Sequence, residues 1–208
     1  YKRQLLVNII LWESEAEDVC EDIDGNIYET VQIGEQLWMA ENLKTTHYNN
    51  GDLISYPSDD DFGSYDEGQY GIYDNDFANA DIYGNLYNSA ADRDDRGICP
   101  EGWHGPSDEE FMELEMELGM SEEEANSYGY RGTDEGSKLA GNSDLWNDGI
   151  LENNSEFGTS GFTAIPAGYR DSISGNYYSM GLSGYFWSSE YGSYGSYSAW
   201  YRLLRYYN

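Results

Sequence analysis

Few side chains in this chain could perform acid–base chemistry at neutral pH, apart from its carboxylates. His47 and His104 are the only histidines, and neither lies near a serine or cysteine nucleophile motif. The 40 acidic residues could include a pair suited to glycoside cleavage, but their abundance makes coincidental pairs inevitable. We expect His104, in a loop rich in glycine and proline, to make a structural hydrogen bond. The sequence therefore predicts a protein that is not an enzyme.

Three oxygen-bearing side chains at alternate positions, Asp22, Asp24 and Asn26, imitate the start of a calcium-binding loop. Such a loop needs Gly at its sixth position and Glu at its twelfth, whereas this chain has Ile27 and Ile33 there. A turn between two strands explains the same residues, because Asp, Gly and Asn favour tight turns. We therefore expect a hairpin at this place and no calcium ion.

Charge and composition restrict the partners of the chain. The formal net charge is −30, from 40 acidic and 10 basic residues, and it repels phosphate backbones and anionic membrane surfaces. We therefore expect no nucleic-acid partner. With 21 Tyr, 6 Trp and 24 Gly among 208 residues, the composition is typical of a β-rich, loop-rich protein. It favours one domain and an extracellular or cell-surface location.

Several local signals predict a helix from Ser107 to Gly119. Ser107 and Glu110 form a capping box, in which each side chain bonds a free backbone N–H of the first turn. One helix face is apolar and the opposite face is acidic, through Phe111, Leu114 and Leu118 on the first and Glu109, Glu113 and Glu117 on the second. Ser121 with Glu124 repeats the capping box, so we expect another short helix or turn there.

Most other elements are predicted to be strands. Gly34 permits a second hairpin between residues 27–33 and 37–39, whereas residues 82–91 have the apolar spacing of a short helix. The second half of the chain holds the main sheet, in four β-prone segments: 162–165, 177–178, 185–189 and 199–203. Two acidic and glycine-rich segments, 49–81 and 141–161, have the composition of long ordered loops.

An apolar run at residues 5–12 precedes the acidic residues 13–17. It is too short to cross a bilayer and lacks a small-residue cleavage site, so we expect neither a membrane helix nor a complete signal peptide. The simplest interpretation is a strand of the domain's own sheet. The alternative is a strand or helix between subunits that completes a neighbour's sheet. We accordingly separate an N-terminal extension, residues 1–18, from a domain over residues 19–208.

Long motifs occur in a characteristic order along the chain. They are DIDGNIYETVQIG and QLWMAENL between Asp22 and Leu43, YGNLYN from Tyr83, CPEGWHGPSDEEF from Cys99, GFTAIPAGYR from Gly161 and FWSSE from Phe186. With these motifs the sequence resembles the Fibrobacter succinogenes major paralogous domain family, from about Cys20 to the end. Motifs of this length in this order are highly specific.

That family is similar to the C-type-lectin-like and formylglycine-generating-enzyme folds, which share a Trp-x-x-Pro-Ser/Thr loop before a helix and a Trp-Ser-Ser strand. The resemblance implies an α+β, C-type-lectin-like mixed domain, with a twisted antiparallel sheet, two or three short helices and long ordered loops. It also implies a secreted or surface-attached bacterial protein of adhesive type. The catalytic cysteines of the formylglycine-generating enzymes do not carry over, since Cys99 precedes the helix and Cys20 lies far upstream.

The two cysteines have three interpretations. Family members usually continue past the position of Tyr206 into a strand with a second cysteine, whereas this sequence stops at Asn208. Cys99 would therefore pair with a cysteine beyond this sequence or with Cys20, in an oxidising compartment. A Cys20–Cys99 disulfide would restrict the unfolded chain by roughly 4 kcal/mol. The third interpretation is two unpaired thiols.

The resemblance also implies where a ligand would bind. Lectin-like relatives use the corresponding strands near their binding surface, where rings stack on sugar faces, and the residues concerned here are Tyr185, Trp187, Glu190, Trp200 and Arg202. The opposing interpretation is that Trp187 and Trp200 fill the core. If calcium is bound, we expect it at the oxygen donors Asp144, Asn147, Asp148, Glu152 and Asn154. Residues 146–148 match the Trp-Asn-Asp calcium motif of C-type lectins, but no Glu-Pro-Asn partner precedes them.

The sequence thus predicts a secreted or cell-surface, non-catalytic recognition and adhesion domain that binds an extracellular glycan, surface polymer or protein. The alternative is a structural subunit of an extracellular filament or coat that assembles through residues 5–12. Deleting residues 1–12 would leave a folded monomer in the first case and would abolish assembly in the second. Neither function needs nucleic acid, insertion into a membrane or a cofactor other than calcium.

Overall fold

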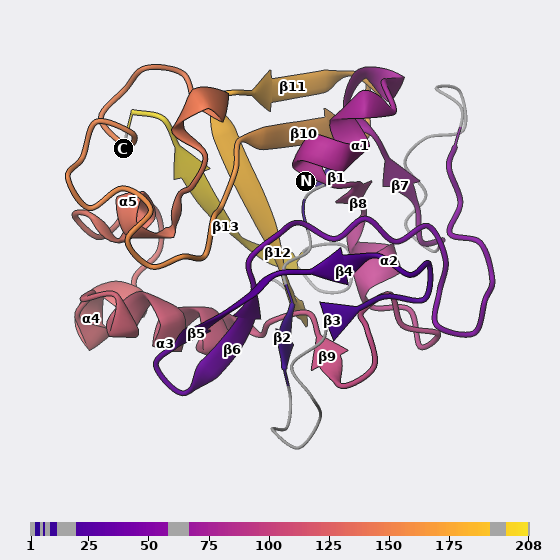
Figure 1. Cartoon of the computed structure of the whole chain (residues 1–208), viewed down its shortest axis with the longest axis horizontal. Coiled ribbons are helices and arrows are strands. Elements are labelled where there is room, and N and C mark those ends of the chain that lie inside the picture. The colour runs from indigo at the N-terminus through magenta and orange to yellow at the C-terminus, as the bar shows by residue number, and fades with distance from the viewer. Residues whose placement is uncertain are drawn as a thin grey trace.

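Short antiparallel strands and a few short helices make up an α+β architecture (Figure 1). The computed structural model describes residues 3–4, 6, 9–11, 20–57, 67–191 and 199–207. The strands in its first half are β1 (Arg3–Gln4), β2 (Ile10–Leu11), β3 (Cys20–Glu21), β4 (Ile27–Tyr28), β5 (Thr30–Ile33), β6 (Gln36–Met39), β7 (Tyr70–Gly71), β8 (Leu86–Tyr87) and β9 (Trp103–His104). Those in its second half are β10 (Ala167–Asp171), β11 (Tyr177–Met180), β12 (Ser183–Tyr191) and β13 (Ala199–Arg205).

The helices are short and lie around the strands. They are α1 (Ala78–Tyr83), α2 (Ser89–Asp92), α3 (Asp108–Glu117), α4 (Glu122–Ala125) and α5 (Glu135–Leu139), with 3₁₀ turns η1 (Tyr73–Asn75) and η2 (Ser143–Leu145). In Figure 1 the β12–β13 hairpin crosses the centre, α3 and α4 lie at the lower left, and α1 and α2 lie on the right. Within the described ranges, no helix is long and apolar enough to span a bilayer.

The strands of the described residues form five small sheets, whereas the sequence predicted one twisted sheet with two or three helices. The strand orders are β5-β6-β2-β9, β1-β10-β11, β12-β13, β3-β4 and β7-β8, and every one of these pairs is antiparallel. Turn-forming Gly, Asn and Asp residues interrupt the chain every few positions and keep most strands at two to five residues. The predicted hairpins β3–β4 and β5–β6 are confirmed, and the predicted strands at 185–189 and 199–203 are found in β12 and β13, which pair with each other.

Leu6, Ile9 and Ile10, from the N-terminal apolar segment, belong to the domain's own core. Strand β2 lies between β6 and β9, with Ile10 opposite both Trp38 and His104. Leu6 extends the edge of β12, because its N–H donates to the Tyr185 carbonyl at 3.0 Å. Leu6 and Ile9 have no exposed surface, and Ile10 is 3% exposed. Residues 1, 2, 5, 7, 8 and 12–18 of the predicted extension, and residue 19 of the predicted domain, lie outside the described residues.

Strand β12 lies between two hydrophobic clusters. Tyr185 and Trp187 belong to the first cluster, which also contains Tyr87, whereas Phe186 belongs to the second. Trp38 occupies the second cluster, with its ring centroid 5.6 Å from that of Phe111 and 5.6 Å from that of Phe162. Because side chains of a strand alternate between its two faces, one strand contributes to both clusters.

Helix α3 has the boundaries and faces that the sequence predicted. Ser107 and Glu110 form the capping box, and Gly119 follows the helix with φ of +118°. Phe111 and Leu114 are buried, and the three glutamates assigned to the outer face are exposed. The second capping box, Ser121 with Glu124, starts α4.

Two predicted elements are wrong. Residues 82–91 are not one helix: α1 ends at Gly84, whose φ is +73°, and the next residues form β8 before α2 begins. Residues 162–165 make only an isolated bridge between Ala164 and Ala140, because Thr163 has φ of +55° and interrupts the extended backbone. The strand instead begins at Ala167, after Pro166.

The burial of Ile9 gives a stability prediction. Ile9→Ala should lower the free energy of unfolding by about 2–5 kcal/mol, because it leaves a cavity in the first cluster. Ile173→Ala, at a side chain 87% exposed, should change it by no more than about 0.5 kcal/mol. Urea unfolding followed by tryptophan fluorescence measures both. Equal stability of the two variants would show that the N-terminal segment does not pack in the core.

Candidate functional site

The carboxylates of Asp22 and Asp24, which imitate a calcium loop, accept hydrogen bonds from other groups of the chain. Oδ1 of Asp22 accepts hydrogen bonds from the backbone N–H groups of Asp24 and Asn26, at 3.0 and 2.9 Å, and so closes the turn. The Asp24 carboxylate accepts from Thr46 and lies against Nδ1 of His47. Partial burial alone would raise the pKa of Asp24, but these hydrogen bonds lower it. The structure therefore confirms a turn here and gives His47 a structural role.

The five predicted calcium donors have different surroundings in the loop around and after η2. Asp144, Asn147 and Asp148 are exposed in the loop around η2. Oδ1 of Asp148 accepts from the Asn153 amide at 2.8 Å, and Oε2 of Glu152 is buried without a hydrogen-bond partner. The Asn154 side chain accepts from a backbone N–H of its own turn. Within the described ranges, no group of three or more His, Cys, Asp or Glu side chains could hold a metal ion; calcium binding stays a prediction.

The two cysteines are buried free thiols in the first hydrophobic cluster. Burial raises the pKa of the Cys20 thiol to about 12, with a further contribution from Asp22 and Glu41. Burial also raises the pKa of Cys99 well above its ordinary value. Because the thiolate is the reactive form, neither thiol is activated as a nucleophile. A disulfide between them stays a prediction.

His104 makes the structural hydrogen bond that the sequence predicted. Its Nε2 lies 3.0 Å from Oε1 of Glu110, the carboxylate that also caps α3. Partial burial would raise the pKa of Glu110, but the hydrogen bonds from His104 and Ser107 lower it. This pair therefore holds the loop before α3 against the first turn of the helix.

The β12–β13 hairpin divides the five predicted ligand residues between two faces. Tyr185 and Trp187 are only 4% and 5% exposed and lie in the first cluster, where the Trp187 indole donates to the Tyr87 carbonyl. Both are core residues, so the ligand contacts predicted for them do not fit this fold. Trp200 and Arg202 lie on the opposite face of the hairpin, the face of Phe186, and are partly exposed. Glu190 is exposed near the start of α3, where its carboxylate accepts from the Asp108 N–H at 3.4 Å.

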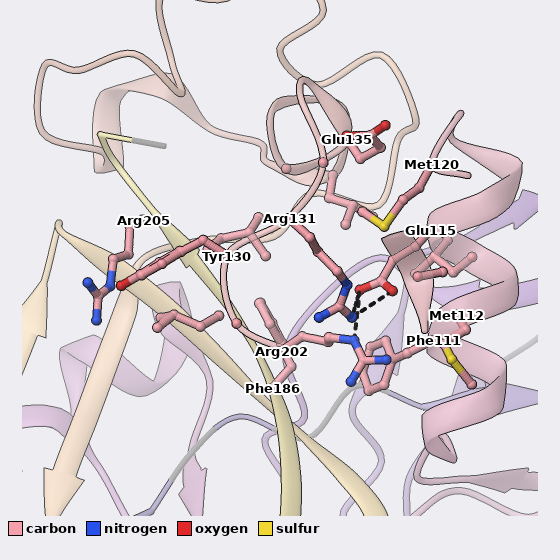
Figure 2. A pocket seen from close by; sticks show the side chains of 18 of the residues that line it. Phe111, Met112, Glu115, Met120, Tyr130, Arg131, Glu135, Phe186, Arg202 and Arg205 are labelled. Atoms are coloured by element: carbon pink, nitrogen blue, oxygen red, sulfur yellow. Dashed lines mark hydrogen bonds and ion pairs between the residues drawn. The ribbon is translucent and has the colours of Figure 1, made fainter. Parts of the chain in front are cut away.

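Trp200 and Arg202 line a cavity of about 850 Å³ between α3, the loop of residues 126–133 and strand β13 (Figure 2). The size is in the range of small-molecule binding sites. Apolar residues of the second cluster, among them Phe111, Leu114 and Phe186, form part of its wall. Charged side chains of both signs also line it: Asp108, Glu115, Glu135, Arg131, Arg202 and Arg205.

Glu115 is the centre of the charged side chains. It is 7% exposed, and both of its oxygens accept from Nη2 of Arg131, at 2.9 and 2.8 Å. Arg202 donates from Nε to Oε1 of Glu115 at 2.7 Å and from Nη1 to Asp108 at 2.5 Å. Figure 2 shows the two guanidinium groups pointing toward Glu115, one from the loop and one from β13.

Aromatic rings surround the cavity. The rings of Tyr128 and Trp200 are stacked, with centroids 5.4 Å apart and planes 22° apart. Tyr128 is 82% exposed and Tyr130 is 65% exposed, and the guanidinium carbon of Arg205 lies 5.2 Å from the Tyr130 ring centroid. Flat apolar surfaces thus stand beside the hydrogen-bonding groups of Glu115 and its arginines.

The sequence analysis missed Glu115, Arg131 and the loop tyrosines. A signal existed for Glu115: it lies four residues after Phe111 and one after Leu114, inside the apolar stripe that continues to Leu118. An acidic residue at such a position is buried and therefore needs a cationic partner. No comparable pattern marks the loop residues.

The half-buried Asp92 has one carboxylate oxygen in the interior, and it does not line the cavity. Its Oδ1 is inaccessible to solvent and makes no hydrogen bond. Burial raises the pKa of Asp92 to about 6, although the charges of Arg93 and His104 oppose the shift. The carboxylate lies so close to Gly105 that a Cβ atom there would be 2.5 Å from Oδ1. The Asp92 carboxyl group therefore packs against Gly105, and burial raises its pKa to about 6.

This raised pKa predicts a pH dependence of stability. The folded protein binds the Asp92 proton more tightly than the unfolded chain does, so the stability contribution is complete below about pH 4 and is lost as the pH rises through about 6. Between pH 4 and 7, wild type should lose on the order of 2 kcal/mol relative to Asp92→Asn. Urea unfolding at several pH values measures the difference. Asp95→Asn, in the neighbouring exposed turn, controls for net charge; a parallel pH course of wild type and Asp92→Asn would contradict the prediction.

The charge cluster gives a second stability prediction for this region. Glu115→Gln leaves Arg131 without its carboxylate and removes one of two partners of Arg202, and we expect a loss of about 3–5 kcal/mol in the free energy of unfolding. Glu109→Gln, at an exposed position of the same helix, should change it by no more than about 0.5 kcal/mol. Chemical denaturation compares the two. A Glu115→Gln protein as stable as Glu109→Gln would show that Glu115 does not stabilise the fold.

Comparison with known proteins places the chain in a family. The family model of the Fibrobacter succinogenes major domain matches residues 31–207, which include the whole cavity, α3 and the β12–β13 hairpin. Searches of the curated proteins and of the solved structures found no match. The matched range covers most of the chain, and the resemblance of its motifs is thereby confirmed. The chain belongs to the Fibrobacter succinogenes major domain family.

Proposed function

We propose that the chain is a non-catalytic recognition and adhesion domain of a secreted or surface-displayed bacterial protein, and that it binds a glycan in the cavity between α3, the loop 126–133 and β13. The observation that carries the proposal is the stacked Tyr128–Trp200 pair in a cavity that Glu115, Arg131 and Arg202 also line.

We also propose that the architecture is C-type-lectin-like. The capped helix after Trp103, Pro106 and Ser107, followed by a Trp-Ser-Ser strand in β12, supports this assignment.

The aromatic rings of Tyr128 and Trp200 suit the faces of sugar rings. A pyranose presents C–H groups on its faces, and these pack on aromatic side chains, while its hydroxyl groups at the edge need hydrogen-bond partners. Tyr128 offers an exposed ring, and the polar side chains of Arg131 and Glu115 line the same cavity. A volume of about 850 Å³ accommodates two or three sugar units.

The described N-terminal residues favour this function over that of a filament subunit. Leu6, Ile9 and Ile10 are already buried in this chain, and β2 is hydrogen-bonded on both sides. A segment that completes a neighbour's sheet would have to leave these contacts. Deletion of residues 1–12 would therefore remove core side chains, and it cannot separate the two functions as the sequence alone suggested.

A glycan array with and without calcium tests the proposal, followed by titration of the strongest glycan. Tyr128→Ala and Trp200→Ala should each weaken binding by about 10-fold to 100-fold, because each removes one ring of the stacked pair. Phe77→Ala removes a ring that is 69% exposed and lies outside the cavity, and it should leave the affinity unchanged. Uniformly blank arrays, or equal losses in all three variants, would contradict the proposal. Loss of binding on removing calcium would support an ion in residues 144–156.

A further inference from the structure

Basic residues are concentrated at this cavity. The chain has 10 basic residues, and three of them, Arg131, Arg202 and Arg205, line the cavity. They stand against three carboxylates, those of Asp108, Glu115 and Glu135, so that the lining is formally neutral in a chain of charge −30. An acidic group is therefore repelled less here than by the average surface of the protein.

Arg131 has an unused donor at the cavity. Its Nη2 is occupied by both oxygens of Glu115, but its Nε is buried and has no hydrogen-bond partner. A buried N–H of a cation without an acceptor is unfavourable, and an anionic oxygen is the strongest acceptor that it can receive. The position of Arg131 thus favours a ligand that brings a carboxylate rather than hydroxyl groups alone.

Arg205 is a second cation without a carboxylate partner among the described residues. Its Nη1 bonds the Tyr207 hydroxyl, and its guanidinium lies over the Tyr130 ring. Figure 2 shows Arg205 and Tyr130 on the side of the cavity away from α3. Arg205 therefore keeps donors that no carboxylate of the described residues occupies, and Arg131 keeps one donor, the buried Nε, without an acceptor.

Two acidic side chains of the lining, Glu135 and Glu115, use their oxygens in hydrogen bonds within the protein. Oε2 of Glu135 accepts from the backbone N–H groups of Thr133 and Asp134, at 2.6 and 3.2 Å. Glu115 is held between Arg131 and Arg202. Both carboxylates bind groups of the loop that carries Arg131, and so they position this arginine. Their pairing also reduces the repulsion of an anionic ligand.

We infer that the ligand is a short acidic oligosaccharide whose uronic acid carboxylate binds Arg131, with Arg205 as a second contact and a sugar face on the Tyr128–Trp200 pair. The inference rests on the proposed function and specifies its ligand. A long polyanion fits less well, because charges of the chain within the screening length of about 8 Å would repel every further carboxylate. One or two ligand carboxylates within the cavity would meet a lining whose three arginines balance its three carboxylates.

Paired probes test this inference by calorimetric titration: trigalacturonate, its methyl ester and neutral cellotriose. The free acid should bind the full chain at least about tenfold more tightly than the ester, which has the same sugar rings without the charge. Arg131→Lys keeps a positive charge beside Glu115 but removes the Nε donor, and it should abolish most of this preference while ester binding changes less than about twofold. Arg205→Gln should reduce the preference by a smaller factor.

Arg96→Gln is the matched control, because Arg96 pairs with Asp52 and Asp94 outside the cavity, and this variant should keep the preference. Circular dichroism and urea unfolding establish that Arg131→Lys is folded. Equal affinity for acid and ester, or a preference that survives Arg131→Lys, would overturn the inference while the glycan array still upholds the proposed function. Tighter binding of an acidic peptide than of any sugar would also overturn it. A blank array contradicts the proposed function itself.

Discussion

A single buried carboxylate, that of Glu115, connects the three parts of the chain that enclose the cavity. The two arginines that pair with it lie 16 and 87 residues further along the sequence. A carboxylate that is 7% exposed is tolerated only when it is paired and hydrogen-bonded, so α3, the loop 126–133 and β13 must approach one another in one arrangement. The shape of the cavity follows from this requirement. Tyr128 and Arg131 have no regular secondary structure to hold them, and their contacts with β13 and α3 fix the loop instead.

Many acidic residues of the chain act as internal acceptors in the same way. Asp22 closes the β3–β4 turn, Glu110 caps α3, and Glu135 binds two backbone N–H groups before α5. In a protein with long loops, backbone groups outside sheets and helices need such partners, because a buried N–H without an acceptor is unfavourable. The charge of −30 is therefore partly the consequence of how irregular segments are stabilised, and not only a property of the surface.

The sequence predicted the elements that depend on neighbouring residues. The capping boxes at Ser107 and Ser121 and the hairpins gave correct positions because turn and cap chemistry is local. The resemblance named Trp200 and Arg202 as ligand residues, and these line the cavity. The sequence could not tell which face of β12 meets solvent, since both faces are apolar and an alternating strand offers no other signal. Tyr185 and Trp187 were therefore assigned to the wrong face. The loop residues have no periodicity, and their place depends on contacts that are distant in sequence.

The two-sided burial of β12 also explains why the cavity lies where it does. Tyr87 and its neighbours cover one face of the strand, Phe111 and Phe162 cover the other, and Leu6 adds backbone hydrogen bonds at its edge. Strand β12 thus has few side chains left for a ligand. One face of strand β13 is turned toward α3 and is covered only in part. The loop 126–133 closes the remaining side and so completes the cavity. The exposed residues of this loop, Tyr128 and Tyr130 among them, can change with little effect on either hydrophobic cluster, so binding specificity can vary there while Arg131 keeps its pairing with Glu115.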